Sequence, residues 1–350
     1  MANEQLIARP DDPILITGGT GFIGKRVVRS LLDRGYRNLR CLSRPSSPAT
    51  AQMDVPDGAR VEIVRGNLLS RDDCAAAAKD VAVVYHLAAA RGEKSFPDAF
   101  MNSVVTTRNL LDAAREHGRL KRFVNISSFA VYSNSGKPKW RLLDEECPVE
   151  QYPARRGHAY TFAKAKQDDI VKEYGEKFDV PYVIVRPGYV YGPGNEAITN
   201  RVGIGTFGLF LHLGGSNTVP FTFVDNCADA IVLAGLVAGV DGQTFNVVDD
   251  DLPSSRQFLR QYKRRVRRFN SLYLPHAVSY SLCRLWERYS EWSEGQLPPV
   301  YNRLAWHAFW KKTGYSNAKA KQLLGWTPRV STEEGLNIYF QSCRERTRHA

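Results

Sequence analysis

The sequence lacks any apolar run long enough to cross a membrane. Its longest runs, residues 81–90 and 202–215, are shorter than the roughly 18–20 residues that a membrane-spanning helix requires. The N-terminal stretch "MANEQLIARPDD" contains acidic residues and no apolar core, so it does not have the form of a secretory signal. These absences argue against a membrane-spanning or secreted protein and predict a cytoplasmic one.

The chain also lacks the cysteine and histidine patterns of metal sites and disulfide frameworks. Its six cysteines are scattered without a C-x-x-C pair, and its seven histidines contain no H-E-x-x-H pattern. This distribution argues against structural zinc and disulfides and fits a reducing compartment. The sequence therefore predicts no metal site.

Acidic residues are in the minority. The 48 lysines and arginines outnumber the 36 aspartates and glutamates, which gives a net charge of +12. The densest basic stretch, "RQYKRRVRR" at 260–268, follows Ser254 and Ser255, residues typical of a helix N-cap. We expect a short helix there with a solvated basic face, or alternatively a face that contacts a membrane or polyanion. No aromatic residues alternate with these cations as in base-stacking proteins, so nucleic-acid binding is not predicted.

Strand and helix patterns alternate through the first half of the chain. This alternation is typical of a parallel sheet covered by helices on both faces, the doubly wound α/β (Rossmann) class. The expected strands are 13–19, 38–43, 60–67, 81–89, 122–128, 181–188 and 242–248, and the expected helices are 24–35, 71–79, 103–118 and 158–177, with a strand end and a helix in 222–237.

After residue 188 the pattern loosens, because glycines crowd residues 192–215 and the C-terminal part becomes aromatic and basic. The sequence predicts a main domain from 1–188 plus 222–248. It predicts a smaller lobe, which would bind substrate, from 189–221 plus 249–350.

A glycine-rich loop lies at the first expected strand-to-helix junction. In "ITGGTGFIGK" (16–25), Gly18, Gly21 and Gly24 keep a three-residue spacing. Such a loop turns sharply, lets the backbone approach a pyrophosphate and directs helix N–H groups at its charge. The loop and its position together predict a dinucleotide site.

The end of the second expected strand bears on the choice between NAD and NADP. An acidic residue about 20 positions past the loop would bind the ribose hydroxyls of NAD. This sequence instead has "LSRPSS", which puts Ser43 and Arg44 there. Arg44 can pair with a 2′-phosphate, so NADP is favoured over NAD. The alternative is that Arg44 stacks on the adenine of either cofactor.

Seven motifs follow one another in an order that resembles the extended short-chain dehydrogenases/reductases. They are "TGGTGFIG", "HLAA" (86–89), "NISSFAVY" (125–132), "YTFAK" (160–164), "RPGYVYGPGN" (186–195), "FTFVDNCADA" (221–230) and "AKQLLGWTP" (320–328). The resemblance covers residues 13–337. It implies a nicotinamide-dependent enzyme acting on a small molecule, and a homodimer formed through helices that include 103–117 and 158–174.

The tyrosine motif supplies the expected acid and base. Hydride transfer between a nicotinamide and a secondary alcohol or ketone needs a proton donor or acceptor at the oxygen. The ordinary pKa of tyrosine, about 10, is too high for a base at neutral pH. Lys164 lies one helical turn from Tyr160, and its charge favours the phenolate. Ser128 is the expected hydrogen-bond donor to the substrate oxygen, with Ser127 as the alternative, and His158 is expected to point elsewhere.

The resemblance implies further site residues. Asn102 matches an asparagine beside the nicotinamide, and Asn67 stands where the family more often has an aspartate beside the adenine. The catalytic residues implied are Ser128, Tyr160, Lys164 and Asn102. The cofactor-binding residues implied are Gly18, Thr20, Gly21, Phe22, Ile23, Gly24, Ser43, Arg44, Asn67, Leu68, Leu87, Ala88, Ala89, Tyr160, Lys164, Pro187, Gly188 and Val190. The substrate-binding residues implied are Ser128, Phe129, Asn195 and Arg201.

Two substrate classes remain open. "RPGYVYGPGN" and the C-terminal motif resemble nucleotide-sugar epimerases and dehydratases, which the sequence slightly favours. Those enzymes usually carry an Arg-x-Gly-Asp-type segment before the last motif, and here Lys311, Lys312 or Arg201 would have to replace its arginine. The apolar stretches 202–215 and 272–292 resemble 3β-hydroxysteroid dehydrogenases and related reductases of lipid or polyketide-like ketones. A non-enzymatic cofactor-sensing role is disfavoured because the Ser, Tyr and Lys are all present.

Overall fold

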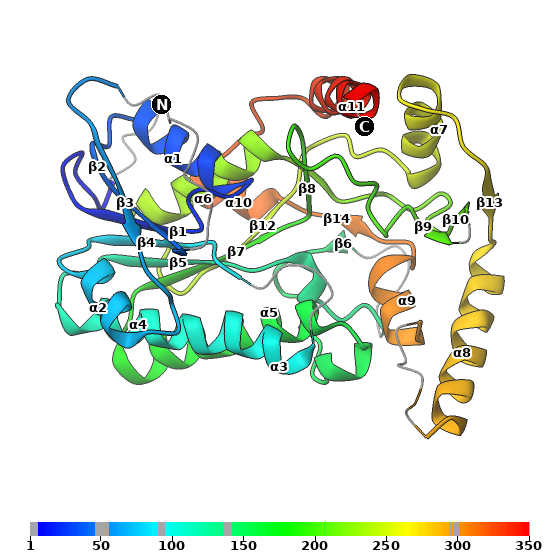
Figure 1. The fold of residues 1–350 in the computed structure, drawn as a ribbon, viewed down its shortest axis with the longest axis horizontal. Helices are drawn as coiled ribbons and strands as arrows, with labels where there is room; N and C mark the ends of the chain where they lie inside the picture. The colour runs from blue at the N-terminus through cyan, green and yellow to red at the C-terminus, as the bar shows by residue number, and fades with distance from the viewer. Residues whose placement is uncertain are drawn as a thin grey trace.

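A seven-stranded parallel sheet forms the centre of the molecule (Figure 1). The computed structural model describes residues 6–45, 56–89, 95–135, 142–206, 208–294, 296 and 301–349. The strand order is β12-β7-β5-β4-β1-β2-β3, and every neighbouring pair is parallel. The strands are β1 (Ile14–Thr17), β2 (Asn38–Ser43), β3 (Arg60–Arg65), β4 (Val83–His86), β5 (Arg122–Ile126), β7 (Tyr182–Pro187) and β12 (Thr244–Val247).

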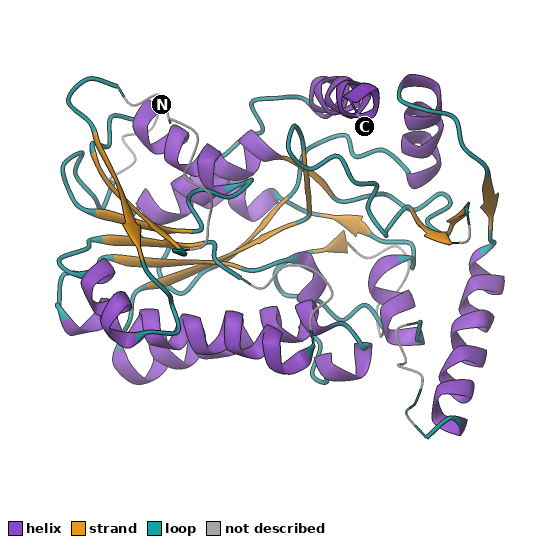
Figure 2. Ribbon diagram, viewed as in Figure 1, coloured by secondary structure: helices purple, strands orange, loops and turns teal. Residues whose placement is uncertain are grey.

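Helices cover both faces of this sheet (Figure 2). One face carries α1 (Gly24–Asp33), α6 (Val224–Leu236) and α10 (Ala318–Leu324); the other carries α2 (Arg71–Ala78), α3 (Phe96–Ala99), α4 (Thr106–Glu116) and α5 (Ala159–Phe178). Successive side chains of a strand point to opposite faces, so Ile14 and Ile16 pack in one hydrophobic cluster and Leu15 in the other. The predicted doubly wound class is confirmed.

A second set of elements forms a lobe at the carboxyl ends of the strands. Its strands are β6 (Leu142–Leu143), β8 (Tyr189–Tyr191), β9 (Gly203–Thr206), β10 (Leu209–His212), β11 (Phe221–Phe223), β13 (Ser271–Tyr273) and β14 (Gly314–Tyr315). Its helices are α7 (Ser255–Arg265), α8 (His276–Trp292), α9 (Arg303–Phe309) and α11 (Thr332–His349). Aromatic rings fill its core, where Tyr191, Phe221, Phe223, Phe258 and Tyr339 are all buried. Ser254 caps α7 in a capping box with Gln257, which confirms the predicted helix start.

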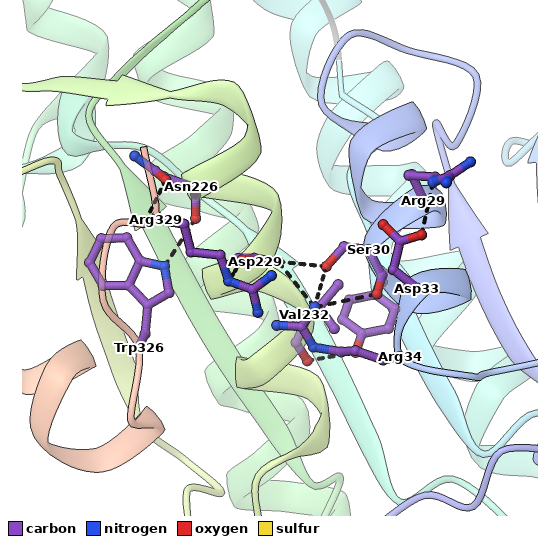
Figure 3. A network of polar contacts seen from close by, with 10 residues as sticks. Arg29, Ser30, Asp33, Arg34, Asn226, Asp229, Val232, Trp326 and Arg329 are labelled. Carbon is purple, nitrogen blue, oxygen red and sulfur yellow. Dashed lines mark hydrogen bonds and ion pairs between the residues drawn. The ribbon is translucent and has the colours of Figure 1, made fainter. Parts of the chain in front are cut away.

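Two of the family-like motifs, about a hundred residues apart, meet beside α6 (Figure 3). The indole Nε1 of Trp326 donates to the carbonyl oxygen of Asn226 at 3.1 Å, and the Asn226 side chain accepts from the backbone N–H of Arg329 at 3.0 Å. Asp229 then pairs with Arg329 at 2.8 Å and accepts from Ser30 of α1 at 2.7 Å. These contacts hold α10 against the main sheet, although the sequence assigns that segment to the lobe.

The described residues bear on two absences that the sequence predicts: that of a membrane-spanning helix, and that of disulfides and metal sites. None of the helices there is both long and apolar enough to span a membrane. All six cysteines are buried and none forms a disulfide, and no group of three or more potential metal ligands occurs in the described part of the chain.

Candidate active site

The glycine loop connects β1 to α1 by a tight turn. Gly18 has a φ of +70°, a left-handed conformation that disfavours residues with a side chain, and its carbonyl oxygen accepts from the N–H of Gly21 at 2.9 Å. A Cβ on Gly24 would collide with the carbonyl oxygen of Gly18. The first residue of α1 is therefore pressed against the loop, and the helix N-terminus opens toward the end of the sheet.

A cavity of about 380 Å³ lies above this loop, at the carboxyl ends of the central strands. Eleven residues expected from the sequence line it: Gly18, Thr20, Gly21, Ser43, Arg44, Asn67, Leu68, Leu87, Ala88, Ala89 and Asn102. Leu42, Gly66 and Thr106 also line it and were missed, although two of them directly precede predicted residues. The described lining contains no carboxylate, while glycine backbone and Arg44 are present, so the cavity fits an anionic dinucleotide.

The other expected cofactor residues lie behind or beside this cavity. Phe22 lies beside Gly194, whose Cβ, if present, would be 3.2 Å from the phenyl ring, and Ile23 is the N-cap residue of α1. Pro187 ends β7, Val190 is in β8, and Gly188 between them leaves no room for a Cβ against the carbonyl oxygen of Pro220.

Tyr160 and Lys164 lie one turn apart at the start of α5, and their side chains differ sharply in exposure. The Tyr160 side chain is 39% exposed, whereas Lys164 is only 4% exposed. The Lys164 ammonium donates to the carbonyl oxygen of Ile126 at 2.5 Å and to Oε1 of Gln167 at 2.9 Å. These two hydrogen bonds therefore fix the position of the Lys164 ammonium inside the fold, whereas the Tyr160 side chain stays accessible.

A buried chain of hydrogen bonds runs from Lys164 to the glycine-loop side of the sheet. Nε2 of Gln167 donates to Thr107 at 2.7 Å, and Thr107 donates to the carbonyl oxygen of Ser103 at 2.5 Å. The Thr107 hydroxyl uses its only proton in the bond to Ser103. Nε2 of His86 must therefore be the donor in the 2.8 Å hydrogen bond between His86 and the Thr107 oxygen.

The same reasoning fixes the far end of the chain. With its proton on Nε2, His86 accepts at Nδ1 from the hydroxyl of Thr17 at 2.8 Å, and Thr17 accepts from the N–H of Ala88 at 3.2 Å. Four elements, β1, β4, α4 and α5, are joined in this way. Sequence patterns did not reveal the chain, because its members are far apart in the sequence.

Burial sets the protonation of Lys164 and His86, the two titratable members of the chain. Desolvation lowers the pKa of Lys164 to about 8, against a smaller opposing effect of the Asp168 carboxylate. Desolvation, aided by the charge of Lys164, lowers the pKa of His86 to about 3. His86 is thus neutral at physiological pH, as the hydrogen-bond chain requires, and Lys164 is mostly charged at pH 7.

The two candidate serines after β5 have different surroundings. Ser127 is buried and donates to Oδ2 of Asp168 at 2.9 Å, beside Arg186, which pairs with the same oxygen at 2.9 Å. Ser128 is half-buried, and its Oγ accepts from the N–H of Ala130 at 3.2 Å. The Ser128 hydroxyl proton is not used in that bond, which makes Ser128 the better donor to a substrate.

Two asparagines expected near the cofactor are held by local bonds. Asn102 lies in a π-helical turn, η1 (Phe100–Val105), just before α4, and its Nδ2 donates to the carbonyl oxygen of Asp98 at 2.9 Å. Such turns recur at functional sites. Asn67 is exposed, its Oδ1 accepts from the N–H of Leu69 at 3.1 Å, and its own N–H donates to Asp73 at 2.7 Å.

Arg201 is a nearly buried cation of the lobe. It is 9% exposed, donates to the carbonyl oxygen of Ala308 at 3.0 Å, and forms no ion pair with a carboxylate of the described residues. Its guanidinium lies 5.3 Å from the Phe309 ring centre and within 3.4 Å of the Tyr315 hydroxyl.

Those two aromatic neighbours connect Arg201 to the segments that carry the expected catalytic residues. The Tyr315 ring stacks on Phe129, which follows Ser128, and the Phe309 ring meets His158, two residues before Tyr160. Phe129 is itself buried in a hydrophobic cluster. Asn195, by contrast, donates to the carbonyl oxygen of Val190 at 2.8 Å and is part of its own loop.

The parallel sheet, the glycine loop and the Tyr–Lys pair define a nicotinamide-dependent oxidoreductase class. Residues 14–247 match the NAD dependent epimerase/dehydratase family, and the chain belongs to that family. It is therefore an NAD(P)-dependent oxidoreductase or epimerase of the extended short-chain type.

Individual relatives differ in what they act on. The chain is 29% identical to the 2-alkyl-3-oxoalkanoate reductase of Stenotrophomonas maltophilia (strain K279a), over 92% of this chain and 97% of that protein. It is 27% identical to the UDP-glucose 4-epimerase of Mycolicibacterium smegmatis (strain ATCC 700084 / mc(2)155), over 92% and 95%. The crystal structure of gox2253 has the same fold, with a TM-score of 0.74, 24% identity and coverage of 97% and 99%.

Proposed function

We propose that the protein interconverts a ketone and a secondary alcohol whose molecule also carries an anionic group, and that Arg201 binds that group. The observation that carries this proposal is the placement of Arg201. A guanidinium that is 9% exposed and lacks a carboxylate partner among the described residues is costly unless a ligand supplies the negative charge. Its neighbours Tyr315 and Phe309 contact the segments of Ser128 and Tyr160.

The residues of the chain divide the chemistry as follows. The nicotinamide cofactor, when bound, supplies a hydride to the carbonyl carbon or accepts it from the alcohol carbon. Tyr160 gives its phenolic proton to the carbonyl oxygen as the hydride arrives, so ketone, hydride and proton together make the alcohol; oxidation reverses both transfers. Ser128 donates a hydrogen bond to the same oxygen, and Lys164 stabilises the phenolate.

A carboxylate suits this site better than a diphosphate. One guanidinium can bind one carboxylate in a bidentate manner, whereas a diphosphate spreads its charge over more oxygens. Phe309 and Tyr315 offer apolar surface beside the guanidinium. The 2-alkyl-3-oxoalkanoate named for one relative contains both a ketone and a carboxylate. We therefore place 3-oxo or 3-hydroxy acids with apolar substituents first.

Nucleotide sugars are the second candidate, because the UDP-glucose 4-epimerase is similar over nearly the whole chain. Lys311, which the sequence suggested as a diphosphate ligand, donates to the carbonyl oxygen of Asn134 at 2.7 Å. Lys312 is exposed. An epimerase returns the hydride to its own substrate and need not release its cofactor, so the dinucleotide retained by the purified protein separates the two candidates.

The test is to denature freshly purified protein and identify any released dinucleotide by mass spectrometry, then to assay NADPH and NADH oxidation with a panel of 3-oxo acids. Turnover with an acid and reversible dinucleotide binding support the proposal. Stoichiometric, tightly held NAD with turnover of UDP-glucose but of no acid contradicts it.

We also propose that NADP is the preferred cofactor. Arg44 lines the cofactor cavity at the end of β2, and no carboxylate of the described lining would repel a 2′-phosphate. Arg44→Ala should raise the KM for NADPH about tenfold and leave the KM for NADH nearly unchanged. An equal change for both cofactors would favour stacking of Arg44 on the adenine instead.

A homodimer through the helices that include residues 103–117 and 158–174 is a further proposal, supported by the family resemblance. Light scattering at micromolar concentration is expected to give twice the mass of the chain; the mass of a single chain would contradict it.

A further inference from the structure

One end of the lobe combines an unpaired basic face with an exposed apolar row. It is formed in succession by α7, β13 and α8, which lie along one edge of the molecule in Figure 1. We call this combination the α7–α8 edge. Its two halves differ in chemistry: the cations of one half form no ion pair with a carboxylate of the described residues, and the apolar side chains of the other half are exposed.

The basic half carries positively charged side chains and no negatively charged ones. Residues 252–286 contain eight arginines and lysines and no aspartate or glutamate. Arg256, Arg260, Lys263 and Arg264 follow the i, i+4, i+7, i+8 spacing of one helix face. No carboxylate of the described residues forms an ion pair with any of the eight cations. Lys263, Arg264 and Arg268 line a hollow beside Phe269.

The apolar half is a row along the outer face of α8. Val278, Leu282, Leu285, Tyr289 and Trp292 follow alternating steps of four and three residues, which places them on one stripe of the helix. Their exposed fractions are 45%, 49%, 61%, 49% and 76%, in the same order. The opposite face of α8 holds the buried residues Ser279, Cys283 and Ser290.

Strand β13 joins the two halves directly. The Arg256 guanidinium lies 5.2 Å from the centre of the Tyr273 ring, and Lys263 donates to Ser271 at 2.5 Å. Leu272 between them is 51% exposed. The cations of α7 thus contact β13, and β13 leads through two residues into α8, which carries the apolar row.

We propose that the α7–α8 edge binds the surface of an anionic lipid bilayer, with the cations of α7 at the headgroups and the row on α8 inserted among the acyl chains. A helix with a leucine and tryptophan row next to arginines is suited to that interface. A second copy of the chain would bring two basic faces together, and a polyanion such as RNA would leave the apolar row without a partner. The proposal does not depend on which substrate the enzyme uses.

The test is co-sedimentation of the purified protein with vesicles of equal parts phosphatidylcholine and phosphatidylglycerol, compared with pure phosphatidylcholine. We expect binding to the anionic vesicles that weakens with salt. Each cation near such a surface raises the partition coefficient about fivefold, so the triple variant Arg260→Glu, Arg264→Glu, Arg268→Glu should lower it more than a hundredfold. Arg71→Glu, on α2, is the matched control and should change little.

The apolar row needs its own variants, because charge alone would also attract a polynucleotide. Leu285→Ser with Trp292→Ser should lower vesicle binding about tenfold or more, while Leu323→Ser, an exposed leucine of α10, should not. Trp292→Phe should retain binding and lose the vesicle-induced blue shift of tryptophan fluorescence.

Three results would overturn the proposal: no binding of the folded wild type to anionic vesicles, equal loss in the Arg71→Glu control, or tight polynucleotide binding that the serine variants leave unchanged. Thermal unfolding of each variant verifies that it is folded.

Discussion

Two buried cations, Lys164 in the main domain and Arg201 in the lobe, differ in the partners that the fold provides for them. Lys164, on the sheet side, donates to Ile126 and Gln167, and Gln167 continues into a hydrogen-bond chain that ends at Ala88. Arg201, on the lobe side, donates to one backbone carbonyl and one tyrosine hydroxyl and otherwise faces aromatic rings.

This difference separates what the fold fixes from what it leaves for a ligand. The partners of Lys164 come from the main domain, so the cation is positioned before any substrate arrives. Arg201 has unused donors and no counter-charge among the described residues, so its desolvation is offset only when an anion binds. Changes on the Lys164 side should therefore affect stability and the chemical step, whereas changes at Arg201 should affect substrate recognition.

The largest effect is expected at Tyr160, the proposed proton donor. Tyr160→Phe removes the only proton that the proposed chemistry transfers, and kcat should fall about 10²–10⁴-fold. Because Tyr160 is 39% exposed, the variant should fold normally and retain its affinity for the dinucleotide in a fluorescence titration. Turnover close to that of the wild type would remove Tyr160 from the mechanism.

At Arg201 we expect an effect on KM. Arg201→Met should raise the KM for a 3-oxo acid about 10–100-fold, since a hydrogen bond between charged groups is lost. The methyl ester of the same acid has no charge to lose and serves as the control: its kcat/KM should be similar in both proteins. If the kcat/KM of the ester falls as much as that of the acid, Arg201 supports the structure of the lobe and does not bind the anion.

On the Lys164 side the matching test is Gln167→Leu. The variant leaves the buried Thr107 oxygen and the Lys164 ammonium with one partner fewer, and the free energy of unfolding should fall by about 1–3 kcal/mol. The alkaline limb of the kcat profile should also move to lower pH, because the cation loses a stabilising acceptor. Gln261→Leu, at an exposed glutamine, is the control. A loss of stability without movement of the profile would mean that Gln167 does not act through Lys164.

The depressed pKa of Lys164 gives a smaller effect with a defined sign. In the unfolded chain the lysine keeps its ordinary pKa of 10.5, and in the fold burial lowers it to about 8. Between these values the unfolded state binds more protons, so stability from this group is lowest below pH 8 and rises as pH increases toward 10.5. The wild type should therefore gain stability relative to Lys164→Met when urea unfolding is measured at pH 9 instead of pH 7. An unchanged difference would show that the ammonium is not desolvated.

The same contrast explains what could be predicted from the sequence. The strands and helices of the main sheet were predicted to within a few residues, because their apolar side chains repeat with the period of the element. The glycine loop and the Tyr–Lys pair were also found, since their chemistry depends on local spacing. Trp326 and α10 were assigned to the lobe by sequence position, yet Trp326 packs in the main core against α6.

What the sequence could not show is long-range pairing. Thr17, His86, Thr107 and Gln167 form one hydrogen-bonded chain although they come from four separate segments, and the motif "HLAA" that begins at His86 does not indicate these partners. Similarly, Arg201 was one of three candidate cations in the sequence. Only its burial and the contacts of Tyr315 and Phe309 set it apart from Lys311 and Lys312.

The most direct test of the central claim is transfer of label from deuterated NADPH, carrying deuterium at the transferable C4 position, to a 2-alkyl-3-oxo acid, followed by mass spectrometry of the product. The account predicts a 3-hydroxy acid with one deuterium at C3, formed by the wild type, reduced strongly by Tyr160→Phe, and requiring higher acid concentration with Arg201→Met. No label in the acid, together with conversion of UDP-glucose that leaves the label on the cofactor, would contradict it.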